Sequence, residues 1–275
     1  MATHKHLSSQ STDIVLLPSP KQGTTWLKSL LFSIMHHGPS PQEHQTHPLL
    51  SRHPHELVPN LEVQIYGKNP MLDISCLASP RLFNTHISYS TLPNSIEESN
   101  CKIVYVARNP RDTLVSLWHF LGHFYKGLEP LSFEETFECF CEGRVHYGPF
   151  FEHVLEYWEA SKERPHNVLF LAYEELKADT KGGVKRIAEF LGRPIEREEE
   201  VEGIVEMCSF ERLSNLEVNK SEEKAKWGPC LPYNSVYRKG VVGDWANYFT
   251  PEMIERLDEI TREKLEGSGV EFRFC

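Results

Sequence analysis

Residues 19–28 read Ser19-Pro20-Lys21-Gln22-Gly23-Thr24-Thr25-Trp26-Leu27-Lys28. They follow a short apolar segment, 14–17, with the length of a strand, and they lead into an apolar segment, 27–36, with the length of a helix. A loop with a glycine and two hydroxyls at a helix start is typical of an anion site, because free backbone N–H groups and the helix dipole favour negative charge there. Lys21 adds a positive charge. The segment therefore predicts a phosphate-binding loop between a strand and a helix.

The order of residues in this loop differs from that of the nucleoside triphosphate loop, Gly-x-x-x-x-Gly-Lys-Ser/Thr. Here Lys21 precedes Gly23 instead of following it. An ATP-type site is therefore disfavoured, and a different phosphorylated donor is indicated. For the loop taken alone, a strand–turn–helix junction without a ligand is the alternative interpretation.

Short apolar segments alternate with longer amphipathic ones along the chain. The expected strands are 14–17, 81–85, 103–107 and 168–172, and the expected helices are 25–36, 111–125, 133–141, 149–161, 184–191, 199–208 and 251–265. This alternation predicts an α/β fold with a mostly parallel central sheet flanked by helices. A length of 275 residues and a hydrophobic content of 40% suit a single domain with one core. Ligands of such sheets bind at the carboxyl ends of the strands, and Lys21 and Arg108 both follow predicted strand ends.

The bulk composition excludes several classes of protein. The formal net charge is −10, so a general binder of nucleic acid is not expected and an anionic ligand requires a local basic pocket. Seven scattered cysteines without a Cys-x-x-Cys pair predict reduced thiols and a cytoplasmic location. Residues 1–12 lack the apolar core of a signal peptide, and no apolar run approaches the roughly 20 residues of a membrane span. We therefore expect a short disordered N-terminus, 1–12, then one domain, 13–275, and no membrane partner.

A second candidate anion site follows the predicted strand 103–107. Arg108-Asn109-Pro110 forms the turn, and Ser116 lies about one helical turn into the next helix, on the face toward Arg108. An arginine fork and a hydroxyl that converge at a helix start suit a phosphate monoester. An ion pair between Arg108 and a surface carboxylate is the alternative.

Two further segments supply cations and a histidine. Residues 238–245 read Arg238-Lys239-Gly240-Val241-Val242-Gly243-Asp244-Trp245, which places two cations beside a glycine where backbone can approach an anion closely. A solvated basic turn is the alternative for these cations. At the end of the predicted strand 81–85, Asn84-Thr85-His86-Ile87 supplies a histidine. A lone histidine is more often structural than catalytic, so its role depends on its context.

Histidines crowd one proline-containing stretch of the chain. They are His36, His37, His44, His47, His53 and His55. Their spacings match no standard pattern of metal ligands, so we expect a solvated loop and no metal site. The polar segment 219–239 is expected to be a long loop, and long loops in compact domains are often functional lids.

Together these segments resemble the cytosolic sulfotransferases. Residues 20–26 resemble the family's Pro-Lys-Ser-Gly-Thr-Thr-Trp, with Gln22 in place of serine. Residues 108–116 resemble Arg-Asn-Pro-x-Asp-x-x-x-Ser, and residues 238–245 resemble Arg-Lys-Gly-x-x-Gly-Asp-Trp. His86 lies in a segment similar to Thr/Ser-His-Ile/Leu-Pro, with Ser88 in place of proline. The resemblance runs from residue 13 nearly to the C-terminus, and residues 214–220 resemble the plant branch.

The resemblance implies an enzyme that moves a sulfuryl group from 3′-phosphoadenosine 5′-phosphosulfate (PAPS) to a hydroxyl of a small plant metabolite, without a metal. It implies that His86 is the general base, that Lys21 neutralises the leaving phosphate oxygen, and that Ser116 binds the 3′-phosphate and holds Lys21 back until the acceptor arrives. The implied donor-binding residues are Lys21, Gln22, Gly23, Thr24, Thr25, Trp26, Arg108, Ser116, Tyr173, Phe210, Arg238, Lys239 and Gly240. For Trp26 and Phe210, packing in the core is the alternative to contact with adenine.

This chain also departs from the family pattern. Asn84 stands where some relatives carry a lysine, so a second catalytic cation is not expected. Members usually carry a longer segment before the first strand, which predicts an N-terminally short domain with an altered acceptor pocket. The lysine and valine of the family's dimer motif are replaced within residues 246–255, which predicts a monomer or a weak homodimer.

The sequence leaves the acceptor open among flavonoid, brassinosteroid, hydroxyjasmonate and desulfoglucosinolate types. It also leaves two other functions open. One is a catalytically impaired relative that binds PAPS or its product adenosine 3′,5′-bisphosphate (PAP). The other is a nucleoside or metabolite kinase, which would use ATP and magnesium.

Overall fold

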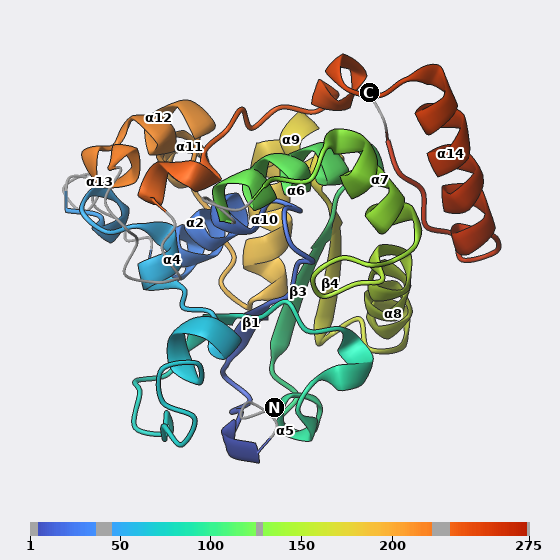
Figure 1. The fold of residues 1–275 in the computed structure, drawn as a ribbon. Coiled ribbons are helices and arrows are strands. Elements are labelled where there is room, and N and C mark those ends of the chain that lie inside the picture. The colour runs from blue at the N-terminus through green and yellow to red at the C-terminus, as the bar shows by residue number, and fades with distance from the viewer. Residues whose placement is uncertain (1–4, 37–45, 125–128, 222–231, 274–275) are drawn as a thin grey trace.

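The fold is built on a parallel sheet with the strand order β2-β1-β3-β4 (Figure 1). The computed structural model describes residues 5–36, 46–124, 129–221 and 232–273. Its strands are β1 (Ile14–Leu16), β2 (Leu82–Asn84), β3 (Lys102–Ala107) and β4 (Val168–Ala172). Ile14 pairs with Leu82 on one side and with Lys102 on the other, and Ile103 pairs with Val168. The predicted single-domain α/β fold with a parallel sheet is confirmed.

All the predicted helices are present within a few residues of their expected bounds. They are α2 (Thr24–Met35), α6 (Pro110–Phe124), α7 (Phe133–Cys141), α8 (Phe150–Glu163), α10 (Thr180–Phe190), α11 (Glu198–Met207) and α14 (Pro251–Leu265). The apolar pattern did not reveal the short elements α4 (Pro54–Leu57), α5 (Asn94–Glu98), α9 (Tyr173–Ala178), α12 (Phe210–Asn215), α13 (Glu217–Lys220), η1 (Pro48–Leu50), η2 (Leu61–Ile65), η3 (Tyr89–Thr91), η4 (Tyr233–Val236) and η5 (Asp244–Asn247). Such short elements hold too few residues to display a helical period. Of the expected loop 219–239, residues 222–231 lie outside the described part of the chain.

The two faces of the sheet bury separate apolar clusters. Successive strand residues point to opposite faces, so Val15 and Tyr105 pack with α6, α7, α8 and α14, whereas Leu16 and Val104 pack with α2, α10 and α11. Because helices cover both faces of the sheet, most successive residues of each strand are apolar. The polar residues that follow them therefore gather at the carboxyl edge of the sheet.

Residues 5–12 pack against the domain. Leu7 is buried in the core, and its carbonyl accepts a hydrogen bond from the Ser95 hydroxyl at 2.6 Å. The Ser8 carbonyl accepts one from Arg81 at 2.9 Å. The disorder predicted for 1–12 is therefore a wrong prediction for residues 5–12, because Leu7 finds an apolar site. Residues 1–4 lie outside the described part of the chain.

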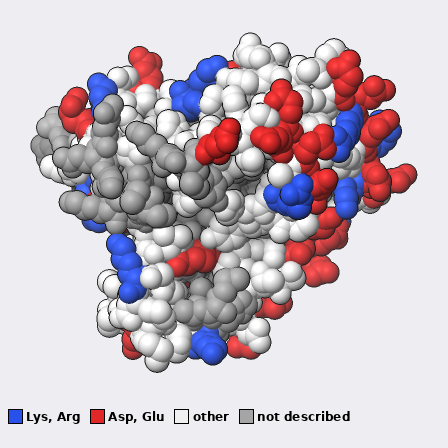
Figure 2. Space-filling view, in the orientation of Figure 1, with Lys and Arg blue, Asp and Glu red and all other residues white. Residues whose placement is uncertain are grey.

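Acidic side chains dominate one side of the surface. Figure 2 shows Asp and Glu gathering over the side of the molecule where Figure 1 places α7, α8 and α14. Ion pairs join these helices there, between Arg256 and Glu138 at 2.5 Å and between Lys264 and Glu152 at 2.8 Å. In the described part of the chain, no helix combines the length and the apolar character that crossing a bilayer requires.

Candidate active site

A cavity of about 470 Å³ lies at the carboxyl edge of the sheet, lined by residues that follow each of the strands. The predicted site residues that line it are Lys21, Gly23, Thr24, Thr25, Trp26, His86, Arg108, Ser116, Tyr173, Phe210, Arg238, Lys239 and Gly240. They come from segments far apart in the sequence. The fold thus brings together every predicted site residue but one.

The exception is Gln22, whose side chain turns away from the cavity. It is fully buried, and its Oε1 accepts a hydrogen bond from the backbone N–H of Ser19 at 3.1 Å. The side chain therefore braces the loop from behind. Contrary to the prediction, Gln22 is not placed to touch a ligand in the cavity with its side chain.

The shape of the loop depends on Gly23, the N-cap of α2. Its φ is 100°, and a Cβ at this position would lie 2.8 Å from the ring of Tyr173. Only glycine avoids both the strain and the clash. Lys21 also has a positive φ, 70°, a conformation that non-glycine residues adopt mainly where a site requires it. The first turn of α2, with its free N–H groups, thus borders the cavity through Thr24 and Thr25.

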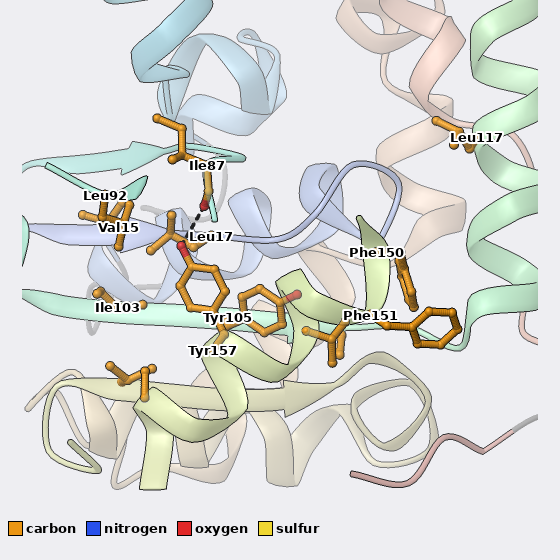
Figure 3. Close-up of a cluster of buried hydrophobic side chains, with 14 of the residues drawn as sticks. Val15, Leu17, Ile87, Leu92, Ile103, Tyr105, Leu117, Phe150, Phe151 and Tyr157 are labelled. Carbon is orange, nitrogen blue, oxygen red and sulfur yellow. Dashed lines mark hydrogen bonds between the residues drawn. The ribbon is translucent and has the colours of Figure 1, made fainter. Parts of the chain in front are cut away.

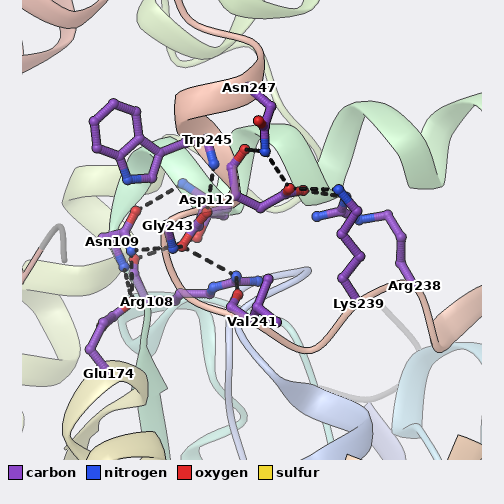
Figure 4. A network of polar contacts seen from close by, with 12 residues as sticks. Arg108, Asn109, Asp112, Glu174, Arg238, Lys239, Val241, Gly243, Trp245 and Asn247 are labelled. Carbon is purple, nitrogen blue, oxygen red and sulfur yellow. Dashed lines mark hydrogen bonds and ion pairs between the residues drawn. The ribbon is translucent and has the colours of Figure 1, made fainter.

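The turn after β3 is held by buried carboxylates (Figure 4). Glu174 Oε1 accepts hydrogen bonds from the backbone N–H of Asn109 at 3.0 Å and from its side-chain amide at 2.8 Å. Asn109 in turn caps α6 by accepting from the N–H of Asp112 at 2.8 Å. Arg108 is buried and lies 3.4 Å from the fully buried Asp112. Its carboxylate partner is therefore an interior group and not a surface one.

Asp112 also joins this turn to the segment 238–245. Its carboxylate accepts hydrogen bonds from the backbone N–H groups of Gly243 at 2.8 Å and Trp245 at 3.1 Å. Arg108 donates to the carbonyl of Val241 at 2.8 Å (Figure 4). Two segments that are far apart in sequence therefore form one rigid wall of the cavity.

Asp244 fixes the two cations that were predicted from this segment. Its carboxylate lies 2.5 Å from Arg238 and 2.7 Å from Lys239, and it accepts from Asn247 at 3.0 Å (Figure 4). Burial alone raises the pKa of Asp244, but the hydrogen bonds from Lys239, Arg238 and Asn247 outweigh it and lower the pKa to about 2. The carboxylate is therefore ionised at every ordinary pH and holds both cations beside the cavity.

Three residues that line the cavity have a buried polar atom without a hydrogen-bond partner among the described residues. The atoms are Thr24 Oγ1, Arg108 Nε and the Tyr237 hydroxyl oxygen. An unpaired buried polar group costs about 1–3 kcal/mol of stability, so such atoms are usually hydrogen-bonded to a ligand or to a water molecule. Thr24 begins α2, directly after the loop that follows β1, and Arg108 lies in the turn after β3. The arrangement fits a donor with phosphate groups at two separate positions.

Lys21 lies among like charges. Its Nζ is 4.3 Å from the centre of the Phe120 ring. Burial, followed by repulsion from Arg108 and Arg238, lowers the pKa of Lys21 from 10.5 to about 8. An added anion would relieve this repulsion. Ser116, the other predicted partner of this lysine, lines the same cavity.

Aromatic rings form a further part of the wall. Trp26 meets Tyr173 edge to face with 5.5 Å between ring centres, and both line the cavity. Phe210 lies against Gly240, where φ is 65° and a Cβ would approach the ring to 2.4 Å. Trp26 and Phe210 are half-buried at the cavity surface instead of enclosed in the core. Their position suits stacking on a flat base.

His86 follows β2 and faces the cavity as a neutral base. Its Nδ1 lies 2.6 Å from the carbonyl of Pro18, which can only accept, so Nδ1 carries the proton and Nε2 is the free acceptor. Burial lowers the pKa of His86 from 6.5 to about 4, and the Pro18 hydrogen bond only partly opposes this. The imidazole therefore stays neutral well below neutral pH and can take a proton at Nε2.

The backbone at His86 is anchored by buried polar side chains. The Tyr157 hydroxyl donates to the carbonyl of Ile87 at 2.8 Å (Figure 3). His153 Nε2 lies 3.0 Å from the carbonyl of His86, and Tyr105 holds the other ring nitrogen of His153 at 3.0 Å. The rings of Tyr105 and Tyr157 stack with centres 4.3 Å apart. The core of the protein therefore fixes the backbone that carries the His86 imidazole.

The histidine-rich stretch is not a solvated loop where the structure describes it. His47, His53 and His55 are buried, and His55 lines the cavity. His37 and His44 lie outside the described residues. The prediction failed because short elements, η1 and α4, pack these histidines against α2, which their spacing does not reveal. In the described part of the chain, no three His, Cys, Asp or Glu side chains form a group suited to a metal ion.

Comparison with known proteins decides the family. A family model described as the sulfotransferase domain matches residues 11–269. The chain is 45% identical over 274 residues to cytosolic sulfotransferase 5 of Arabidopsis thaliana, an alignment that covers 98% of this chain and 84% of that one. The chain belongs to the sulfotransferase family.

Solved structures of sulfotransferases share its fold. A crystallised candidate steroid sulphotransferase of Arabidopsis thaliana is 42% identical, with a TM-score of 0.77 and coverage of 98% of this chain and 82% of that one. A mouse sulfotransferase crystallised with PAP is 29% identical, with a TM-score of 0.78 and coverage of 98% and 89%.

Asn84 of this sulfotransferase is a structural residue. Its amide donates to the carbonyls of Leu16 at 3.2 Å and Thr85 at 3.1 Å, and its Oδ1 accepts from Asn60 at 3.3 Å. A buried amide therefore ties β2 to β1.

Proposed function

We propose that this sulfotransferase moves a sulfuryl group from PAPS to a hydroxyl of a small, largely apolar plant metabolite. The observation that carries the proposal is a single cavity that joins a cationic end to a histidine base. The cationic end holds the loop after β1 with the start of α2, and the wall around Arg108, each with an unpaired buried polar atom. Phosphates at the two ends of one nucleotide suit those two places, and the mouse relative was crystallised with such a nucleotide, PAP. The relatives are named cytosolic, which supports a cytosolic location.

The donor supplies an electron-poor sulfur, and transfer proceeds by in-line displacement. His86 accepts the proton of the acceptor hydroxyl at Nε2, while the Pro18 carbonyl holds its Nδ1–H. Lys21 places its charge beside the 5′-phosphate oxygen on which negative charge builds. Ser116, Arg108, Arg238, Lys239 and Gly240 bind the 3′-phosphate, and Trp26, Tyr173 and Phe210 enclose the base. The 3′-phosphate contacts exclude adenosine 5′-phosphosulfate as a donor.

The remaining lining favours a flat apolar acceptor. Most of the remaining lining side chains are apolar or aromatic, among them Val63, Leu117, Phe120, Leu121, Phe124, Tyr147 and Val236, whereas others, such as Asn60, Gln64 and His146, are polar. A mostly apolar wall removes an aromatic or steroidal ring system from water more effectively than it binds a sugar. Among the acceptor types considered, flavonoid and brassinosteroid alcohols therefore fit better than a desulfoglucosinolate.

The first test is thermal stabilisation by PAP, with ATP–magnesium and 5′-AMP as controls. A shift with PAP that exceeds both controls is expected, because only PAP engages both anion sites. Activity is then assayed with labelled PAPS against phenolic and steroidal alcohols, with and without a chelator. Indifference to the chelator separates sulfuryl transfer from a magnesium-dependent kinase. Absence of any PAP shift would overturn the proposal.

The second test separates an active enzyme from a silent binder. His86→Gln should abolish turnover and leave PAP affinity within about twofold, because the base faces the acceptor. His166→Gln is the matched control, since His166 is exposed just before β4, at the edge of the sheet away from the cavity. Turnover that survives His86→Gln would refute the assignment of the base. PAP binding without turnover in the unmodified protein would identify a catalytically impaired relative.

A further inference from the structure

A buried lysine–histidine pair lies behind the donor loop and has no part in the mechanism above. Lys28 on α2 is fully buried, and its Nζ lies 3.1 Å from Nδ1 of His55 in α4. Nε2 of His55 lies 3.0 Å from the hydroxyl oxygen of Thr25. Both Thr25 and His55 line the cavity. A chain of contacts therefore runs from the core to the first turn of α2.

The direction of the hydrogen bonds in this chain follows from their donors. Burial, reinforced by the charge of Lys28, holds the pKa of His55 well below its ordinary value, so the ring is neutral. A neutral imidazole has one donor and one acceptor nitrogen. Burial lowers the pKa of Lys28 from 10.5 to about 7, so below that pH Lys28 is an ammonium, which can only donate. The ammonium donates to Nδ1, which leaves the proton of the ring on Nε2. Nε2–H then donates to the Thr25 hydroxyl oxygen.

This direction decides what the Thr25 hydroxyl can offer. A hydroxyl has one proton, and its oxygen here already accepts from His55. The proton is therefore available as a donor on the cavity side. Without the pair, the hydroxyl could rotate and accept instead, which an anionic ligand would disfavour.

We propose that His55 and Lys28 are positioning residues that fix the Thr25 hydroxyl as a hydrogen-bond donor to the 5′-phosphosulfate end of the donor. The inference rests on the proposed function, in which the loop after β1 binds this end. It assigns a role to a buried amino group that packing alone does not require, since an apolar side chain would fill the same space without the cost of burying a polar group. Neither His55 nor Lys28 need touch the donor for this effect.

The test compares two nucleotides by titration calorimetry on the full chain at about pH 6, where Lys28 is an ammonium and His55 is neutral. PAP carries the 5′-phosphate, and adenosine 3′-monophosphate lacks it. His55→Leu and Thr25→Val should each weaken PAP binding about five- to tenfold and leave the 3′-monophosphate affinity unchanged. The double variant should bind PAP no more weakly than Thr25→Val alone, because His55 acts through that hydroxyl. His55→Gln should recover most of the affinity, since its amide can accept from Lys28 and donate to Thr25.

Controls keep the outcomes separate. His47→Gln changes another buried histidine that does not line the cavity, and it should leave both affinities unchanged. Lys28→Met interrupts the same chain of contacts at its other end, and it too should weaken PAP binding and leave the 3′-monophosphate affinity unchanged. Misfolding of one variant therefore does not prevent the test. Additive losses in the double variant, or an equal loss for both nucleotides, would show a merely structural role and overturn the inference. If the unmodified protein bound no PAP, the proposed function itself would fail.

Discussion

The anchoring of His86 by the core can be tested with Tyr157→Phe. Tyr157 is fully buried, and its hydroxyl donates to the carbonyl of Ile87, directly after the base, at 2.8 Å. Phenylalanine keeps the ring and its stacking on Tyr105, where the ring centres are 4.3 Å apart. The substitution therefore removes one hydrogen bond and little else.

The magnitude follows from the carbonyl that is left behind. Ile87 is 2% exposed, so water does not readily replace the lost donor. An unpaired buried acceptor costs about 1–3 kcal/mol of the free energy of unfolding. For a chain of this size that corresponds to roughly 2–4 °C in Tm per kcal/mol. Loss of this hydrogen bond also allows the His86 side chain to move. A displacement of about 1 Å can lower a rate roughly a hundredfold, so we expect a smaller displacement to lower kcat about three- to tenfold.

The assay combines urea unfolding with steady-state kinetics. The urea midpoint should fall with an unchanged m-value, kcat should fall, and PAP affinity should stay constant, because the anion sites lie on other segments. Tyr89→Phe is the matched control, since the Tyr89 hydroxyl is only partly buried and accepts a long 3.3 Å bond from Arg164. It should change the free energy of unfolding by less than about 0.5 kcal/mol. Unchanged stability and kcat in Tyr157→Phe would refute the idea that the core fixes the base.

Three further outcomes are expected. The imidazole of His86 should titrate near pH 4 and not near 6.5, because burial disfavours its protonated form. An NMR titration, with the His86 signal assigned by its loss in His86→Gln, measures this pKa. An apparent pKa above 6 would contradict the prediction. Asp13→Asn should lower the free energy of unfolding by about 3–5 kcal/mol, because the Asp13 carboxylate lies 2.5 Å from the buried Arg81 and its loss leaves that cation without a counter-charge. A urea midpoint equal to that of the unmodified protein would contradict this prediction. Gly240→Ala should weaken PAP binding about tenfold, because a Cβ at φ 65° would displace the Phe210 ring, and calorimetry that shows equal affinities would exclude this role for the glycine.

The strands, the long helices and the segments that line the cavity could be predicted from the sequence. Each strand is a short apolar run, and Lys21, His86, Arg108 and Tyr173 each follow such a run. The carboxyl ends of parallel strands lie at the same edge of the sheet, so residues that directly follow the strands are predicted to lie close together. This geometric rule explains why these four residues share a cavity although their segments are distant, whereas Ser116, Phe210 and residues 238–240 reach it through the packing of the helices.

Other features of the site depended on packing between segments. The direction of the Gln22 side chain, the burial of His55 against Lys28 and the bridge from Asp112 to Gly243 were not predictable from local patterns. The sequence shows the chemical type of each side chain, but it does not show which distant residue that side chain contacts. A histidine in a proline-containing stretch has the same local signature whether it faces water or a helix.

The sequence by itself determined which basic, hydroxyl and imidazole side chains lie in the loops and turns of this sulfotransferase, because strand, loop and glycine signals act over a few residues. Only the tertiary structure decided how those groups are held. Asp112 and Glu174 hold the turn at Arg108, and Asp244 pairs with the two cations. Core side chains contact the backbone that follows His86, and His55 contacts the Thr25 hydroxyl. The physical reason is that a hydrogen bond or an ion pair between distant segments depends on distances of a few tenths of an ångström, which are set only when the helices pack on the sheet.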